Sequence, residues 1–282
     1  NLQCGANSNT STSGYTQTNL MSWLARANYS YDDRYYATAS IRLDGSSKLA
    51  EGHKWGSFAS AAVAWRISGE SFMQDVDWIN NLKVRLSFGQ SGNDNVSAYQ
   101  TMGSISGAKQ YTFGSSELIG YVPNNLRNLD LGWERTNEYN IGLDFGFFQN
   151  RISGSIEYYD RITKDLIMNK TVPVTSGYSS VKANVGTVRN NGVEVLLNTV
   201  NVKTGDFTWR TSFNLSYNKN RILTLQKKPT TAYYLTLYQA NPGYYTTNNW
   251  LEGHDMNTQW CYKYGGLQNN GSASSPQTST LK

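Results

Sequence analysis

Long apolar runs are missing from this sequence. Only 38% of its 282 residues are hydrophobic, and no stretch approaches the roughly 20 consecutive apolar residues that a membrane-spanning helix needs. This shortage argues against a helical membrane protein. It does not exclude a transmembrane β-barrel, whose strands require an apolar side chain only at every second position.

Residues that carry catalytic or metal chemistry are also scarce. The two cysteines, Cys4 and Cys261, lie far apart and show no metal or redox spacing; whether they pair stays open. The two histidines, His53 and His254, stand in loop-like sequence without a partner at ligand spacing. Phosphate-binding glycine loops, nucleophile elbows and zinc motifs do not occur. We therefore expect no enzyme, no metal site and no cofactor.

Charge of one sign is not concentrated anywhere. The 25 Lys and Arg residues exceed the 20 Asp and Glu residues by a formal charge of +5, and the longest basic run is Lys227-Lys228. A nucleic-acid-binding protein would need a clustered basic patch with exposed aromatic residues. Because the basic residues are scattered, we expect no nucleic-acid partner.

Aromatic residues and two-residue alternation are, by contrast, plentiful. The chain has 20 tyrosines and 8 tryptophans. In residues 82–89, Leu, Val, Leu and Phe alternate with Lys, Arg, Ser and Gly, which places the two sets on opposite faces of a strand. Segments of this kind predict eight strands and a weaker ninth, at 23–31, 34–43, 58–68, 82–89, 139–147, 152–160, 192–200, 207–217 and 259–264.

The strand lengths indicate a membrane protein. A tilted strand of about nine to eleven residues crosses a hydrocarbon core, and aromatic residues at strand ends suit a lipid–water boundary. The sequence therefore predicts an all-β protein, an antiparallel transmembrane β-barrel. A large soluble β-sandwich also alternates and stays open as an alternative.

The connections between these strands fall into two length classes. Short turns are expected at 32–33, 149–150 and 203–206, and long polar segments at 44–57, 91–132, 161–188 and after 218. A short helical turn suits 69–81. If the strands run strictly up and down, all the short turns lie at one end and all the long segments at the other. Outer-membrane barrels have this asymmetry, with short periplasmic turns and long extracellular loops.

Several motifs resemble one known family. They read YDDRYYATASIRLDGSSKLAEGHKWGSFASAAVAWRISGESFM (31–73), LKVRLSFGQSGN (82–93), LGWERTNEYNIGLDFGFFQNRISGSIEYYDRITKDLI (131–167), NVGTVRNNGVEVLL (184–197) and FTWRTSFNLSYNKNRI (207–222). Together they are similar to the SusC/RagA-type TonB-dependent transporters of Bacteroidetes, with Ala59 where that family usually has proline. The motifs cover about residues 22–222.

The resemblance implies a 22-stranded outer-membrane barrel, plugged by an N-terminal domain. It implies active import of an oligosaccharide or peptide, energised by the TonB complex through a plug segment outside this chain. A SusD-like surface lipoprotein and outer-membrane lipids would be its other partners. Residues 1–282 supply about eight to ten strands, clearest over 22–222, and so few cannot close such a barrel. We therefore expect a partial barrel domain, a piece of a larger polypeptide.

Two other function classes stay open. One is a passive porin or structural outer-membrane barrel without TonB coupling, which a plug segment in the longer polypeptide would exclude. The other is a soluble β-rich adhesin or glycan-binding protein, which would be extractable without detergent.

Candidate site residues follow from the faces of the strands and from the loops. Charged residues on the polar faces are expected to face a lumen, either lining it or forming ion pairs with one another: Arg26, Arg42, Arg66, Lys83, Arg85, Asp144, Glu157, Glu194 and Arg210. Ligand-binding residues are expected in the extracellular loops, where function concentrates: Asn93, Asp94, Asn95, Tyr99, Tyr111, Tyr121, Tyr178, Tyr244, Tyr245 and Trp250. The glycine-containing segments Asp44–Ser47 and Gly92–Asn93 are expected to form turns at strand ends.

Overall fold

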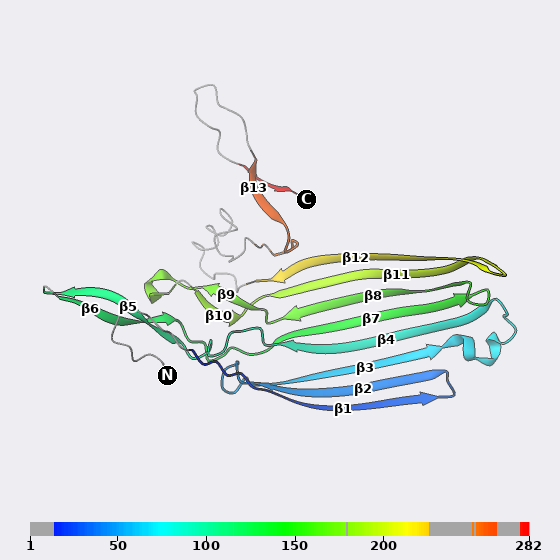
Figure 1. The fold of residues 1–282 in the computed structure, drawn as a ribbon, viewed down its shortest axis with the longest axis horizontal. Helices are drawn as coiled ribbons and strands as arrows, with labels where there is room; N and C mark the ends of the chain where they lie inside the picture. The colour runs from blue at the N-terminus through cyan, green and yellow to red at the C-terminus, as the bar shows by residue number, and fades with distance from the viewer. Residues whose placement is uncertain are drawn as a thin grey trace, which may run out of the picture.

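The computed structural model describes residues 14–114, 116–178, 180–225, 250, 252–263 and 277–281. One antiparallel sheet of eight strands dominates it, in the order β1-β2-β3-β4-β7-β8-β11-β12 (Figure 1). Its strands are β1 (Leu20–Tyr31), β2 (Tyr35–Ser46), β3 (Trp55–Arg66), β4 (Ile79–Asn93), β7 (Glu134–Phe147), β8 (Ile152–Lys164), β11 (Thr187–Thr204) and β12 (Phe207–Thr224). All eight predicted strands are therefore confirmed.

Smaller elements connect these strands. The segment after β3 forms two 3₁₀ turns, η1 (Ile67–Gly69) and η2 (Ser71–Met73), which confirms the expected helical turn. Three hairpins stand outside the sheet: β5 (Ser104–Phe113) with β6 (Ser116–Asn125), β9 (Ile167–Thr171) with β10 (Ser180–Asn184), and β13 (Gln259–Lys263) with β14 (Gln277–Leu281). A third 3₁₀ turn, η3 (Val174–Ser176), lies between β9 and β10.

The long connections are more ordered than the sequence suggested. The segments 91–132 and 161–188, expected as loops, contain the β5–β6 and β9–β10 hairpins, which extend from the end of the sheet opposite the short turns (Figure 1). We call these ends the loop end and the turn end. Strands β11 and β12 are also longer than predicted, 18 residues each. Their backbone pairing continues where the apolar alternation stops, because backbone groups need partners on either side of that boundary.

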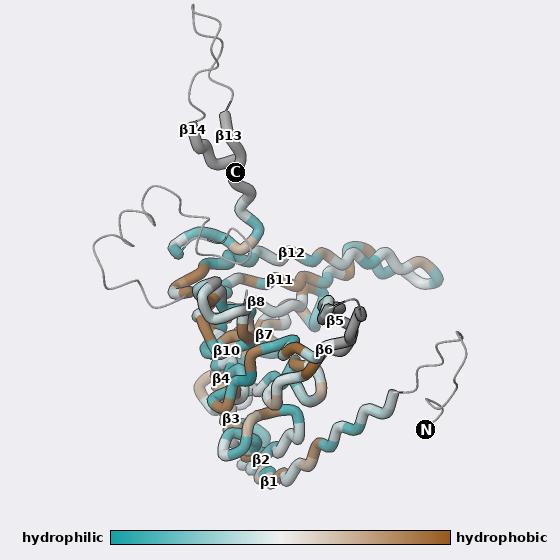
Figure 2. Tube along the Cα trace, turned by 90° about the vertical axis from the view of Figure 1, so that its left-hand side faces the viewer, coloured by the Kyte–Doolittle hydropathy of each residue, from teal (hydrophilic) through white to brown (hydrophobic). Residues whose placement is uncertain are grey.

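The register sorts the two sets of side chains onto two faces. One row across six strands is Val63, Leu86, Ile141, Tyr158, Val193 and Tyr217. The neighbouring row, one residue along each strand, is Ala64, Arg85, Gly142, Glu157, Glu194 and Ser216. Adjacent strand residues point to opposite faces, so the sheet has an apolar face and a polar face. Figure 2 shows hydrophobic and hydrophilic stretches interleaved along the strands.

The apolar face is uncovered in the described part of the chain. Leu86, Ile141 and Leu215 are 46%, 53% and 55% exposed. A fully buried aliphatic side chain contributes roughly 1.5–3 kcal/mol that an exposed one forgoes. Such a face across eight strands therefore needs an apolar surrounding. No helix in the described residues is long and apolar enough to cross a membrane.

The buried core lies at the loop end and is small. Its cluster consists of Leu49, Ala50, Phe58, Val96, Leu131 and Trp133, and Val188 and Ile222 are buried as well. The Phe58 and Trp133 rings meet edge to face with centroids 5.5 Å apart, and the Trp133 indole N–H donates to the Lys54 carbonyl oxygen at 2.9 Å. This cluster fixes the connections after β2, β4 and β6 to the loop end of the sheet.

The two glycines expected in turns serve packing instead, so that expectation is wrong. Gly45 lies within β2 and Gly92 within β4, and neither has a left-handed φ. A Cβ on Gly92 would come within 2.1 Å of the Phe58 ring, and one on Gly45 within 2.9 Å of the Trp55 ring. A side chain at either position would overlap an aromatic ring, so both positions are occupied by glycine.

Candidate functional site

An ion network lies at the centre of the polar face. Arg85 on β4 donates from Nε and Nη2 to the two carboxylate oxygens of Asp144 on β7, each at 2.9 Å. Its Nη2 also pairs with Glu157 on β8. A Cβ on Gly142 would lie 3.0 Å from the guanidinium, so this glycine lets Arg85 lie flat across the sheet. The three strands thus present one cation between two half-buried carboxylates.

The surroundings make this part of the face acidic. Glu194 on β11 is the cross-strand neighbour of Glu157 and is exposed. Arg85 and Lys83 therefore face three carboxylates on neighbouring positions, Asp144, Glu157 and Glu194, which leaves a surplus of one negative charge. A cationic or hydrogen-bond-donating group from outside this sheet would be stabilised against such a surface.

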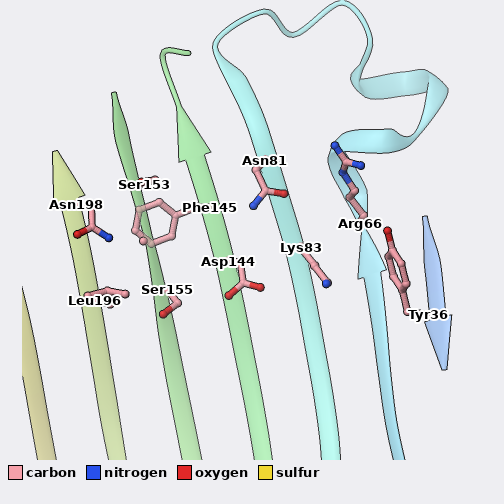
Figure 3. Close-up of a pocket in the computed structure, with 11 residues that line it drawn as sticks. Tyr36, Arg66, Asn81, Lys83, Asp144, Phe145, Ser153, Ser155, Leu196 and Asn198 are labelled. Atoms are coloured by element: carbon pink, nitrogen blue, oxygen red, sulfur yellow. The ribbon is translucent and has the colours of Figure 1, made fainter. Parts of the chain in front are cut away.

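A hollow of about 540 Å³ opens on the sheet between this network and the turn end. Figure 3 shows Lys83 and Asp144 on neighbouring strands, with Tyr36 and Arg66 on one side and Ser155 and Asn198 on the other. It is lined by Tyr36, Arg66, Asn81, Lys83, Asp144, Phe145, Ser153, Gly154, Ser155, Leu196 and Asn198. Ammonium, guanidinium, hydroxyl and amide groups surround it, which suits hydrogen bonding to a polar protein surface or solute.

The cations at the edge of this hollow already have partners. The Lys83 ammonium lies 4.7 Å from the centroid of the Tyr36 ring, and Arg66 pairs with Asp33 at 2.6 Å. In the described residues no three His, Cys, Asp or Glu side chains are arranged to hold a metal ion. The arrangement can bind and orient polar groups.

All nine residues predicted to face a lumen lie on the polar face. Three form the network (Arg85, Asp144, Glu157), Arg42 pairs with Asp44 at 2.7 Å, and Arg66 and Lys83 line the hollow. Arg26, Glu194 and Arg210 are exposed. The mutual pairing expected as an alternative is therefore present for part of the set. That this face lines a lumen stays a prediction.

The predicted ligand residues of the loop before β5 fall into two groups. The Asp94 carboxylate accepts from the Ser46 hydroxyl and pairs with Lys48 at 3.0 Å, and Asn93 donates to Glu134 at 3.3 Å. Asp94 thus holds its loop to the connection after β2, and Asn93 joins the ends of β4 and β7. Asn95 is exposed and is available to a ligand.

The predicted aromatic ligand residues are spread over the loop end. Tyr99 is 49% exposed, and its hydroxyl accepts from the Gln17 backbone N–H at 3.2 Å. Tyr121 is 77% exposed on β6, and Trp250 is half-buried. Tyr111 lies on β5. Tyr244 and Tyr245 lie outside the described residues.

Tyr178 lines a polar cavity that the sequence did not reveal as a unit. The cavity measures about 270 Å³ and lies where residues adjoining β6 meet the β9–β10 hairpin. Its lining is Gln100, Asn124, Asn125, Leu126, Asn169, Gly177, Tyr178, Ser180, Val181 and Lys182. Amides, two hydroxyl groups and an ammonium group give it hydrogen-bond donors and acceptors. Its asparagines, at positions 124, 125 and 169, carry no spacing signal, so only the fold assembles them.

A second polar cluster missed by the sequence lies at the turn end. Glu70, between η1 and η2, accepts from the Tyr35 hydroxyl at 2.6 Å, the Trp65 indole at 2.9 Å and Arg34 at 3.0 Å. The Tyr35 hydrogen bond, followed by that of Trp65, holds the pKa of Glu70 below its usual value. The cluster ties the β3–β4 connection to β2.

The chain is similar to TonB-dependent receptors over most of its length. The family model described as "TonB dependent receptor-like, beta-barrel" matches residues 3–280. The chain is 38% identical over 219 residues to TonB-dependent receptor P39 of Formosa agariphila, covering 78% of this chain and 21% of that protein. It is 36% identical over 225 residues to TonB-dependent receptor SusC of Bacteroides thetaiotaomicron, covering 78% and 22%.

A solved structure shares the fold. The RagAB peptide transporter superposes with a TM-score of 0.75 at 26% sequence identity, over 90% of this chain and 26% of that one. The chain thus spans about a quarter of the length of the relatives it matches.

Proposed function

The chain belongs to the TonB-dependent receptor β-barrel family, and from this premise we propose that it is part of the wall of an outer-membrane importer. The family expected from the sequence motifs is confirmed, and so is the all-β barrel class, here as a partial barrel. The family comprises receptors and transporters that are not enzymes, as expected.

One observation supports the membrane placement above others: the exposed apolar face. On β12 its apolar side chains run from Phe207 through Trp209, Phe213 and Leu215 to Tyr217. This stretch has the roughly nine to eleven residues that a tilted strand needs to cross the hydrocarbon core. Aromatic rings at both ends match the girdles at the two membrane interfaces. Lipid would then cover the apolar face, and the polar face would line the lumen.

The polar face offers the plug a surface of hydrogen-bonding and charged groups. We propose that the plug, supplied by the rest of the polypeptide, binds against the hollow near the turn end and against the ion network around Arg85. Its movement would be driven by the TonB complex. Hydrogen bonds and ion pairs to such a surface form and break without loss of apolar burial, which suits a contact that must be reversible.

We assign the cargo-binding site to the loop end. RagAB is described as a peptide transporter, and SusC is another relative. The cavity beside Tyr178 offers amides, Ser180 and Lys182, with exposed Tyr99 and Tyr121 elsewhere at the loop end. We propose an oligosaccharide or a peptide as the cargo, held here beneath a SusD-like lipoprotein.

An uptake experiment tests this function. Cells carrying the full-length transporter would receive radiolabelled oligosaccharides or peptides, with and without a protonophore that collapses the inner-membrane energy source. We expect saturable uptake that the protonophore abolishes. Uptake that persists would instead indicate a passive porin, and a full-length protein that stays in solution without detergent would contradict the membrane placement.

A further inference from the structure

The apolar face changes character at the loop end of β11 and β12. Beyond Tyr217 the next two residues on that face are Lys219 and Arg221. Their cross-strand partners on β11 are Asn191 and Arg189. These four side chains line a single hollow of about 200 Å³. It lies on the outside of the sheet, away from the ion network and the predicted lumen.

The hollow carries a surplus of positive charge. Arg189 pairs with both carboxylate oxygens of Asp160 on β8, at 2.7 and 2.8 Å. Lys219 and Arg221 are exposed, and the described residues show no ion pair to either of them. Three cations therefore face one carboxylate, which leaves two positive charges to be balanced from outside the sheet.

Near the loop end the apolar face differs from strand to strand. On β1–β3 the same face stays apolar near the loop end, with Trp23, Leu43 and Trp55 exposed. On β4 and β7 the Gln90 amide donates to the Asn137 side-chain oxygen at 3.0 Å. Arg135 on β7 and Lys164 on β8, both exposed, form the next cross-strand pair on this face toward the loop end. Arg189, Lys219 and Arg221 differ from that pair because they line one shared hollow.

The position of the cations along the strands fits the lipid headgroup layer. Tyrosine rings mark membrane interfaces, and Tyr158 and Tyr217 are the last rings on this face before Asp160 on β8 and Lys219 on β12. At about 3.3 Å per residue, Lys219 and Arg221 lie roughly 7 and 13 Å farther along the strand. Strand tilt reduces these heights, which brings both close to the 5–7 Å or so that each headgroup layer adds to the hydrocarbon core.

We propose that Arg189, Lys219 and Arg221 bind the phosphate of an anionic lipid headgroup on the outer surface of the barrel wall. The inference rests on the membrane placement proposed above. Guanidinium groups bind phosphate oxygens in pairs and lysine adds a point charge. Asn191 supplies an amide donor between them. Such a site would hold one lipid against the wall at the β11–β12 hairpin.

Native mass spectrometry of the full-length transporter in detergent tests the site. The probes are phosphatidic acid and phosphatidylcholine with the same acyl chains. We expect tighter binding of phosphatidic acid, and the double variant Lys219→Gln/Arg221→Gln is expected to weaken it about 20- to 30-fold, at roughly fivefold for each cation. Asp160→Asn frees Arg189 and is expected to strengthen binding.

Lys203→Gln/Arg210→Gln is the matched control. It removes the same two charges from the same hairpin, at the turn end and on the polar face, and should leave phosphatidic acid binding unchanged. Equal loss in the two double variants would contradict the site, because a general charge effect would then account for binding. Inorganic phosphate that competes as strongly as phosphatidic acid would also overturn the lipid assignment. Failure of the full-length protein to enter bilayers would instead count against the proposed function.

Discussion

The two faces of the eight-stranded sheet are built from the same strands and differ by a shift of one residue. The row through Leu86 and Ile141 is apolar and exposed, whereas the row through Arg85 and Glu157 is charged and hydrogen-bonded. Because the side-chain period of a strand is two, the register alone decides which set faces which way. The comparison teaches that one strand pattern gives the sheet two faces of opposite polarity.

A charge on the apolar face is expected to have the largest effect. Leu86→Lys should destabilise the full-length protein in bilayers by about 2–4 kcal/mol, the cost of a cation near the midplane. Ser87→Lys, on the polar face beside it, should cost far less. Urea unfolding from liposomes measures both, and equal costs would mean that the two faces meet the same surroundings.

Removal of the Arg85 guanidinium is expected to have the second-largest effect on stability. Arg85→Met leaves Asp144 and Glu157 as unpaired neighbours, which should cost about 1–3 kcal/mol after allowance for partial exposure. The triple variant with Asp144→Asn and Glu157→Gln should recover much of this loss. The same unfolding assay checks it; a triple variant no more stable than Arg85→Met would show that charge repulsion is not the cause.

Gly92→Ala probes the packing at the loop end. The new methyl group would overlap the Phe58 ring, so we expect a loss of about 1–3 kcal/mol. Gly89→Ala is the control on the same strand, because a Cβ there meets nothing within 4 Å. Thermal unfolding compares the two variants, and a shorter side chain in Phe58→Leu/Gly92→Ala should restore part of the stability.

The smallest expected effect is a pH dependence at the turn end. The pKa of Glu70 lies below its ordinary value of about 4.5, so the folded state favours the ionised form. The stabilisation is therefore complete above about pH 4.5 and is lost as the pH falls through the lowered pKa. Glu70→Gln should flatten the stability profile below pH 4.5; an unchanged acid limb would contradict the assignment.

The sequence predicts the wall of the sheet better than its ends. Alternation over about ten residues is typical of a strand with one apolar face, so it predicts all eight wall strands. The β5–β6 and β9–β10 hairpins were not predicted because they carry no clean apolar alternation of the kind a lipid-facing strand needs. The role of Gly92 was misassigned because only the fold brings the Phe58 ring to it.

The candidate site was only partly predictable. Alternation placed Arg85, Asp144 and Glu157 on one face, but their meeting depends on the registers of β4, β7 and β8, which the sequence does not encode locally. The cavity beside Tyr178 joins residues from two separate connections. Sites made from distant loops need the fold before they can be recognised.

Spin labelling along β4 would examine directly whether the two faces meet lipid and interior. Single cysteines at each position from 82 to 89, in full-length protein lacking Cys4 and Cys261, would carry nitroxide labels in bilayers. Labels at Leu82, Val84, Leu86 and Phe88 should be relaxed by oxygen, which concentrates in lipid, and those at the four intervening positions should not. Uniform accessibility, or the opposite phase, would contradict the assignment of the apolar face to lipid.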